Sequence, residues 1–317
     1  MLFRSWQYTK PRKVVNTIQT VLVQQNGDSW LSQGDSPLIR VSQKLSELGY
    51  NESIKKTGTT PDLIVWSESV LSYPYPDAHF YYEVNPPQEG LYPFIRRLGV
   101  PFLIGSPVTV DKENDLFSNS VLYFDKDADY QGYYGKIKLV PFAELIPGVQ
   151  YQWVRNLLEK LVGFSSGWTP GTTLQLFEIP LKDGTVAKIS TPICFEDAFP
   201  FVCNALHKAG SQVFFNLTND SWSKTRSAEY QHFVIASFRA IENRTTLVRS
   251  TNSGYTVVVN PVGKVIADLP LFKQDYLYTE VPVFEKATTL YGFLGDWLPV
   301  LCSVLVVWTI FKKELKK

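Results

Sequence analysis

Short apolar runs recur along the chain and alternate with longer segments of mixed polarity. The runs are rich in β-branched and aromatic side chains, which is typical of strands. Strands are expected at residues 17–23, 63–66, 102–105, 120–124, 174–179, 187–193, 213–217, 246–250, 255–259 and 265–267. Helices are expected at residues 38–48, 92–98, 154–161, 197–209 and 228–242. This alternation predicts a mixed α/β domain.

Glycine and proline mark several element ends. Gly99 and Gly210 stand where helix C-caps are expected. Residues 260–263 read Asn-Pro-Val-Gly, a turn sequence that predicts a hairpin between two late strands. No linker divides the chain, so we expect one catalytic domain over residues 1–289 and a separate tail over residues 290–317.

The tail contains an apolar run at residues 293–311, in which Asp296 is the only charge, and lysines follow it. At about 1.5 Å per residue this run approaches the bilayer core thickness of roughly 30 Å, so we expect a transmembrane helix. A buried C-terminal core helix is the alternative.

The lysines predict a cytoplasmic C-terminus, with the catalytic domain on the outer side. Nothing near the N-terminus could carry that domain across. We therefore expect that upstream membrane helices are missing from this chain, or that the tail is inserted against the charge rule.

Composition excludes several classes of protein. The 317 residues hold 31 Lys+Arg against 30 Asp+Glu and are 44% hydrophobic, so the chain can bury a core and lacks the basic field of a nucleic-acid-binding protein. A mean hydropathy of -0.08 excludes a chain made mostly of membrane spans. The three cysteines are too few for a disulfide scaffold, and we expect free thiols. Scattered His and Cys predict no metal site, and we expect no cofactor.

Cys194 is the first candidate for chemistry, because it follows a predicted strand and precedes a predicted helix. A helix N-terminus lowers a thiol pKa and offers backbone N–H groups to an oxyanion, although a small buried residue at a strand end is the alternative reading. The usual base would be histidine. His79, His207 and His232 are all poorly placed by sequence.

Acid-base groups could instead be a carboxylate and a lysine. Glu68 lies just past the strand at residues 63–66, where α/β proteins place catalytic side chains. Lys136 and Lys138 precede an apolar segment and would face the same side of an extended chain. From the pattern alone, a solvated loop acid is the favoured interpretation of Glu68, and either lysine could be a surface residue.

Five fragments carry a resemblance to a known family. They are WSES at residues 66–69, YGKIKLVPFAELIP at 134–147, ICFED at 193–197, NDSW at 219–222 together with Gln231-His232, and RAIENRTTLVRSTNSG at 239–254. In order and approximate spacing the chain resembles the apolipoprotein N-acyltransferases, membrane members of the nitrilase (carbon-nitrogen hydrolase) superfamily. The resemblance implies an α-β-β-α sandwich and a Glu-Lys-Cys triad.

The resemblance also implies roles for particular residues. Glu68 would be the general base, Lys136 would stabilise the oxyanion with N–H groups near Phe195, and Cys194 would be the nucleophile. Lys138 is the alternative lysine. The remaining matches are the accessory carboxylates Glu144 and Glu196 and the aromatic substrate contacts Trp30 and Trp222, for which packing is the alternative role.

The chain departs from the family pattern at several positions. Ser67 replaces a common Pro, Ala143 a common Gly and Phe195 a common Tyr, and none of these removes a catalytic atom. Residues 219–224 replace a Trp-Phe-Gly loop expected to cover the lipid entrance, which puts acyl-chain preference in question. The family's N-terminal membrane bundle is absent, which suggests a fragment, an alternative start site or a truncated paralogue.

The implied function is acyl transfer from a phospholipid to the α-amino group of an apolipoprotein's diacylglyceryl-cysteine, through a thioester on Cys194. The expected location is the bacterial inner membrane, with the catalytic domain on the periplasmic side. Phospholipid, apolipoprotein and membrane are the expected partners, without nucleic acid or metal. Two alternatives stay open: an amidase or nitrilase that cleaves a small C–N bond with the same triad, and an inactive truncated paralogue.

Overall fold

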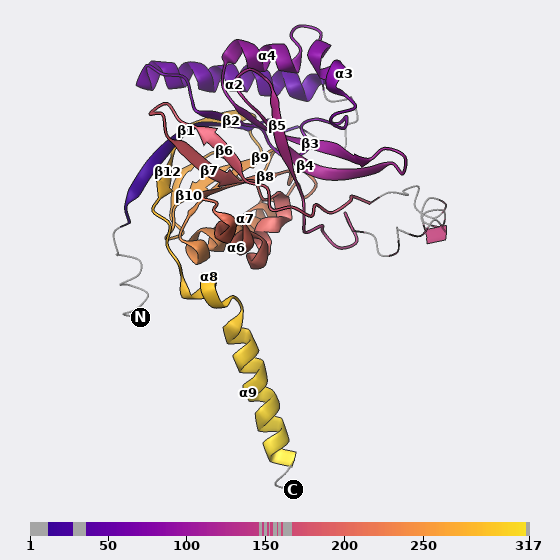
Figure 1. Cartoon of the computed structure of the whole chain (residues 1–317), viewed down its shortest axis with the longest axis vertical. Coiled ribbons are helices and arrows are strands. Elements are labelled where there is room, and N and C mark those ends of the chain that lie inside the picture. The colour runs from indigo at the N-terminus through magenta and orange to yellow at the C-terminus, as the bar shows by residue number, and fades with distance from the viewer. Residues whose placement is uncertain are drawn as a thin grey trace.

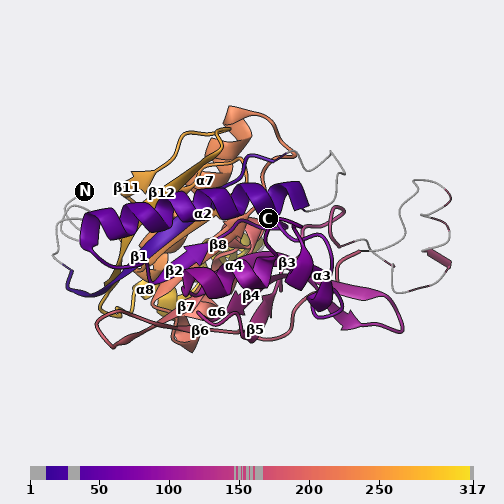
Figure 2. The same ribbon diagram turned by 90° about the horizontal axis from the view of Figure 1, so that it is seen from above.

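The molecule is built from four layers. The computed structural model describes residues 12–27, 36–145, 148, 151, 153–154, 157, 160 and 167–314. Two six-stranded sheets stack face to face, and helices cover the outer face of each (Figure 1). The view from above shows α2 and α4 lying across the first sheet (Figure 2).

The first sheet has the strand order β12-β1-β2-β3-β4-β5. Its strands are β1 (Val14–Gln24), β2 (Leu63–Val65), β3 (Phe102–Asp111), β4 (Leu116–Phe124), β5 (Tyr130–Gly135) and β12 (Asp275–Phe284). The neighbours β1, β2 and β3 pair in parallel, and every other pairing is antiparallel. The carboxyl end of β2 therefore lies in the middle of the sheet.

The second sheet has the order β11-β10-β9-β8-β7-β6. Its strands are β6 (Phe177–Pro180), β7 (Val186–Ser190), β8 (Val213–Thr218), β9 (Thr246–Thr251), β10 (Val257–Val259) and β11 (Val265–Asp268). Here β7, β8 and β9 are the parallel neighbours. Read from β6 across, the pairing directions repeat those of the first sheet read from β12.

The helices divide between the two outer faces and the tail. On the first sheet lie α2 (Ser36–Thr57), α3 (His79–Val84) and α4 (Leu91–Leu98). On the second lie the 3-10 helix η1 (Cys194–Ala198), α6 (Pro200–Ala209) and α7 (Arg226–Asn243), and the tail has α8 (Leu290–Leu294) and α9 (Trp297–Glu314).

Strands buried on both faces explain the continuous apolar runs in the sequence. In β2, Leu63 and Val65 belong to the core cluster that includes the second sheet, whereas Ile64 and the following Trp66 pack in the cluster that includes α2 and α4. Trp66 also donates its indole N–H to Ser46 of α2 at 2.8 Å. Because successive side chains point to opposite faces, such a strand must be apolar throughout.

Most of the strands and helices expected from the pattern are present, with corrections at some ends. The hairpin of β10 and β11 is confirmed, with Gly263 at φ 82 in its turn. Gly99 and Gly210 are confirmed as C-caps. The expectation of one helix over 197–209 is wrong at its start, because η1 ends at Ala198 and α6 begins at Pro200. The helix expected at 154–161 lies largely outside the described residues.

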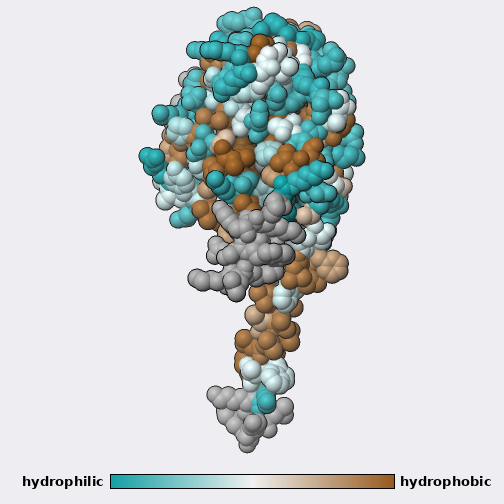
Figure 3. Space-filling model, turned by 90° about the vertical axis from the view of Figure 1, so that its left-hand side faces the viewer, coloured by the Kyte–Doolittle hydropathy of each residue, from teal (hydrophilic) through white to brown (hydrophobic). Residues whose placement is uncertain are grey.

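The apolar tail is not one helix. Gly295, at φ 60, ends α8, and α9 begins two residues later at Trp297. Among the described residues no helix has the combination of length and apolarity needed to cross a membrane, so the expected transmembrane helix is not confirmed. In Figure 1, α9 projects away from the sandwich, and Figure 3 shows its surface as largely apolar.

Gly105 of β3 lies against the backbone of the loop that follows the neighbouring strand β2. A Cβ at this position would lie 2.4 Å from the Ser67 carbonyl oxygen and 2.5 Å from the Glu68 Cα. Gly105→Ala is expected to lower the free energy of unfolding by about 2 kcal/mol or more, since backbone must move. Chemical denaturation measures this. The control Gly58→Ala meets no atom within 4 Å and should cost only about 1 kcal/mol of positive-φ strain; equal losses would contradict the close approach.

Candidate functional site

Glu68 is held just beyond the carboxyl end of β2, buried with 6% of its surface exposed. The Asn119 side-chain amide of β4 donates to Glu68 Oε1 at 2.7 Å. The Asn219 backbone N–H, from the turn after β8, donates to Oε2 at 2.7 Å. The carboxylate is thus fixed from both sheets. Burial raises the pKa of Glu68, the Lys136 charge opposes this, and Glu144 adds to it.

Lys136 follows β5 and is fully buried. Its Nζ lies 2.7 Å from Glu144 Oε1 and 3.7 Å from Glu68 Oε1. Burial alone would lower the pKa of Lys136, but interaction with a Cys194 thiolate and with the two carboxylates outweighs it and raises the pKa. The lysine therefore carries a permanent positive charge between two carboxylates and the thiol.

Cys194 opens η1 in a left-handed conformation, at φ 50. The Asn216 side-chain amide of β8 donates to the Cys194 carbonyl at 2.9 Å, which helps to hold this unusual backbone. Burial, followed by the Glu68 charge, raises the pKa of the Cys194 thiol well above its ordinary value, and Lys136 lowers it in part. The expectation of a thiol pKa lowered by a helix N-terminus is wrong, because η1 has only five residues and the partial burial of Cys194 outweighs the Lys136 charge.

The accessory residues take different positions. Glu144 accepts the Val140 N–H at 2.9 Å and the Lys136 ammonium, so it belongs to the same cluster as Glu68. Phe195 packs edge-on against Phe199 at 5.7 Å. Trp222 is 63% exposed in the turn after β8 and lies outside the buried cluster. Trp30 lies outside the described residues.

Glu196 has a different environment, because its carboxylate is surrounded by donors. It is fully buried and accepts the N–H groups of Ile137, Lys138 and Ile193 at 2.7 to 2.9 Å, together with the Tyr134 hydroxyl. Burial raises the pKa of Glu196 to about 7, although the backbone donors favour the ionised form. Glu196 thereby ties the segment after β5 to the turn that carries the cysteine.

Lys138, the alternative lysine, is not in the cluster of carboxylates. Its ammonium lies 5.4 Å from the centre of the Phe199 ring, and its backbone N–H donates to Glu196. Geometry therefore separates two lysines that the sequence pattern leaves equivalent. Among the described residues there is no group of three or more His, Cys, Asp or Glu arranged to hold a metal ion.

Sequence reasoning misses Asn119, Asn216 and Asn219. Each is an amide side chain or backbone N–H that fixes one reactive group through a contact between distant parts of the chain. The available signal is modest: Asn119 and Asn216 stand inside otherwise apolar or small-residue strands, where a buried amide needs partners.

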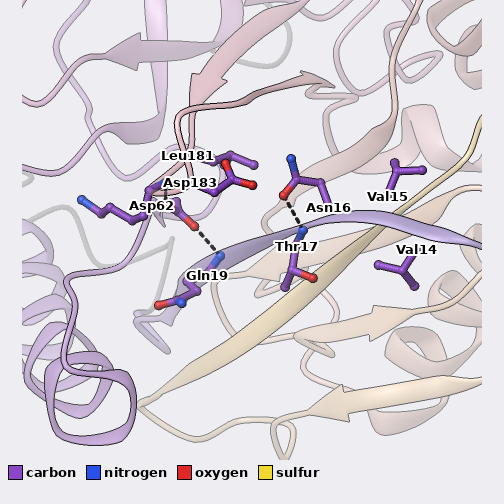
Figure 4. Close-up of a pocket in the computed structure, with 9 residues that line it drawn as sticks. Val14, Val15, Asn16, Thr17, Gln19, Asp62, Leu181 and Asp183 are labelled. Carbon is purple, nitrogen blue, oxygen red and sulfur yellow. Dashed lines mark hydrogen bonds between the residues drawn. The ribbon is translucent and has the colours of Figure 1, made fainter.

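A surface pocket of about 450 Å³ lies elsewhere, between the start of β1 and the loop joining β6 to β7 (Figure 4). Its carboxylate Asp62 already accepts the backbone N–H groups of Gln19 and Lys182. Because Asp62 precedes β2 whereas Glu68 follows it, the pocket lies at the opposite end of that strand from the cluster. The Asp62 carboxylate therefore serves the fold.

Fold and site together define an α-β-β-α sandwich with a Glu, a Lys and a Cys gathered at the carboxyl ends of strands. Residues 38–286 match the carbon-nitrogen hydrolase family, and the chain belongs to that family. Solved structures agree in fold. Saccharomyces cerevisiae Nit3, a member of the nitrilase superfamily, matches with a TM-score of 0.56 at 19% identity over 85% of this chain and 91% of its own. The Caenorhabditis elegans NitFhit protein matches at 0.60 and 16% identity over 92% and 65%.

The sequence is also similar to apolipoprotein N-acyltransferases, as its motifs predict. Apolipoprotein N-acyltransferase 2 of Treponema denticola is 48% identical over 95% of this chain and 56% of its own length. The protein of the same name from Treponema pallidum is 41% identical over 91% and 55%, and the Borreliella burgdorferi apolipoprotein N-acyltransferase is 34% identical over 94% and 55%. The chain thus spans about half the length of these relatives.

Replacing Glu196 with glutamine tests the structural role of its carboxylate. Both oxygens of the Glu196 carboxylate accept hydrogen bonds, but the NH2 group of a glutamine donates and would face other donors. Glu196→Gln is therefore expected to lower the free energy of unfolding by about 2 to 4 kcal/mol. Thermal or denaturant unfolding measures the loss. Glu178→Gln on the surface is the control and should change little. A Glu196→Gln protein as stable as the parent would contradict the role.

Proposed function

We propose that the chain is the catalytic part of an apolipoprotein N-acyltransferase. It moves a fatty acyl group from a phospholipid to the α-amino group of an N-terminal diacylglyceryl-cysteine, through a thioester on Cys194. The observation that carries the proposal is the buried Lys136, in contact with Glu144 and Glu68 and electrostatically coupled to Cys194, in a chain 48% identical to such a protein.

In the first half-reaction, the Cys194 sulfur attacks the ester carbonyl carbon of the phospholipid while Glu68 takes the thiol proton. Lys136 and the N–H groups near Phe195 stabilise the oxyanion. Collapse of the tetrahedral intermediate breaks the C–O bond, and the leaving lysophospholipid alkoxide takes the proton from Glu68. The acyl group remains on sulfur as a thioester.

In the second half-reaction, the neutral α-amine of the lipoprotein attacks the thioester carbonyl and Glu68 accepts a proton from the nitrogen. The C–S bond breaks, an amide forms, and the sulfur leaves as a thiol after it takes that proton from Glu68. A thiol with a raised pKa suits this cycle, because it depends on a base at the moment of attack.

The tail would hold the domain at the membrane. α9 exposes apolar side chains around its whole circumference, including the consecutive residues Val304, Leu305 and Val306, which a helix in water would not favour. The adjoining α8 packs against α7, which exposes Val234 and Phe238. We assign residues 290–317 to a membrane anchor and residues 1–289 to the catalytic domain, in the bacterial inner membrane with the domain on the periplasmic side.

Loss of the cysteine tests the chemistry. Cys194→Ser protein, incubated with phospholipid vesicles and a diacylated lipopeptide, should form N-acyl lipopeptide at least about a hundredfold more slowly than the parent, because the nucleophile is lost. Mass spectrometry of the lipopeptide measures the product. Cys302→Ser, which changes an exposed thiol of α9, is the control and should keep full activity. Full acylation by Cys194→Ser would contradict the thioester route.

The acid limb of the pH profile tests the assignment of the base. Glu68 accepts a proton only when ionised, so the rate should rise with pH through its raised pKa. Glu144→Gln removes a like charge and should therefore shift this limb to lower pH, by about half a unit to one unit. Steady-state rates across pH measure the shift. An unchanged limb, or one that moves to higher pH, would contradict Glu68 as the base.

Charged substitutions test the membrane anchor. Val304→Glu/Val307→Glu places two charges on the exposed surface of α9 and should release the protein from phospholipid vesicles, because burying each charge in lipid costs several kcal/mol, about 2.5 to 3.5 on insertion scales. Vesicle co-sedimentation measures binding. The matched double variant Val110→Glu/Val186→Glu lies on exposed strand positions and should still bind. Equal binding by both variants would argue against the anchor.

Assays for amide hydrolysis distinguish the proposed acyltransferase from its two alternatives. A protein that hydrolyses short amides and forms no acyl-enzyme with phosphatidylethanolamine would be a hydrolase with the same triad. A protein that does neither would be an inactive paralogue.

A further inference from the structure

A cluster of four buried charged residues lies behind the cysteine turn. It consists of Asp197 of η1, Asp220 after β8, His232 of α7 and Arg249 of β9. His232 Nε2 lies 2.9 Å from Asp197 Oδ1, and His232 Nδ1 lies 3.0 Å from Asp220 Oδ1. Arg249 donates to Asp197 Oδ2 at 2.7 Å and lies 3.4 Å from Asp220 Oδ2.

The two aspartates belong to segments that carry the reactive groups. Asp197 follows Cys194 by three residues in the same five-residue helix. Asp220 follows Asn219, whose backbone N–H holds the Glu68 carboxylate at 2.7 Å. A connection between the two aspartates is therefore a connection between the nucleophile's segment and the segment that holds the base.

His232 makes this connection from one rigid ring. Its two nitrogens contact carboxylates on two different segments, and its ring packs 5.6 Å from the ring of Phe195, the residue after Cys194. Both nitrogens donate to carboxylates only in the imidazolium form. In the neutral ring a lone pair on Nε2 would face Asp197, and a lone pair on Nδ1 would face Asp220 as well as Arg249 Nη2, which lies 3.3 Å away.

The surrounding charges favour the imidazolium. Burial and the nearby Arg249 lower the pKa of His232, but Asp197 and Asp220 outweigh both and raise it to about 9. With His232 protonated, two cations face two carboxylates in the buried cluster.

Two further charged groups border the cluster. Burial, followed by the Asp220 charge, raises the pKa of Glu229 to about 7, and Ser223 donates to Glu229 at 2.6 Å. Arg239 of α7 lies 3.3 Å from the Asp197 carbonyl oxygen. Glu229 therefore adds a full negative charge only above neutral pH.

We propose that His232 is a positioning residue, which bridges Asp197 and Asp220 and so sets the placement of Cys194 relative to Glu68. The proposal rests on the proposed function for the reaction in which these two groups act. His232 touches no reacting atom, and its effect passes through η1 and the turn at Asn219. It also places a cation beside Asp220, whose charge raises the pKa of Cys194.

Three variants separate the effect of the His232 bridge on position from the effect of the His232 positive charge. His232→Gln removes the cation and one of the two donors, Asp220→Asn removes one anion but keeps an acceptor, and the double variant restores the charge balance without the bridge. Gln231→Asn, at the exposed neighbouring position on α7, is the matched control. Each protein is prepared in detergent, and thermal unfolding identifies any variant that is not folded.

The first readout is alkylation of Cys194 by iodoacetamide across pH, followed by peptide mass spectrometry. This reaction needs no acyl substrate, so it tests His232 even if the proposed acyl transfer is absent. The midpoint for His232→Gln should rise by about one unit, and that for Asp220→Asn should fall. The double variant should return close to the parent. A parental midpoint in both single variants would overturn the electrostatic part.

The second readout is lipopeptide acylation. His232→Gln and the double variant should both lose kcat by about tenfold to a hundredfold with KM changed less than about twofold, because misplacement of reactive groups affects the chemical step. Recovery of kcat in the double variant would overturn the positioning role, since charge alone would then explain the loss. If His232→Gln alone does not fold, the double variant tests the positioning role by itself, and parental kcat in that folded protein would overturn the proposal.

Discussion

The burial of the Lys136 ammonium is the constraint on which the rest of the site depends. An unpaired charge in a protein interior costs several kcal/mol, so the fold must bring compensating groups to it. Glu144 and Glu68 do so at 2.7 and 3.7 Å. Glu144 comes from the segment after β5, and Glu68 comes from the segment after β2. If either carboxylate moved away, the buried Lys136 ammonium would lose a compensating charge.

The fold brings compensating groups to Lys136 because its two sheets repeat the same order of parallel and antiparallel pairings. Glu68, the proposed base, follows β2, and Cys194, the proposed nucleophile, lies after β7. Each of these strands belongs to the parallel trio of its own sheet. Stacking the sheets brings the two carboxyl ends together. Asn219, after β8, completes the arrangement by holding Glu68 across the interface. The reactive groups are therefore set by sheet packing.

Much of the fold could be predicted from the apolar pattern, and the exceptions have physical reasons. β5 (Tyr130–Gly135) contains two glycines and polar residues, and β12 (Asp275–Phe284) is an edge strand with many half-buried side chains, so neither has a strong apolar run. α2 continues past the predicted end at residue 48, and Gly49 lies inside it where a Cβ would clash with Val21, so the glycine marks close packing and not a helix end.

The site was harder to predict, because the decisive contacts join distant residues. Strand ends pointed to Glu68 and Cys194, but only the family resemblance favoured Lys136 over Lys138, and no local pattern could reveal that Lys136 alone meets the carboxylates. The lowered thiol pKa predicted from a helix N-terminus is wrong because burial dominates.

The central claim is that the acyl group rests on Cys194 between donor and acceptor. It is tested most directly by incubating the protein with phosphatidylethanolamine of defined acyl composition, without lipopeptide, and measuring the intact mass and the modified peptide. We predict a gain of one fatty acyl group on the peptide that contains Cys194, released by neutral hydroxylamine. An unmodified Cys194 peptide from protein that still acylates lipopeptide would contradict the claim.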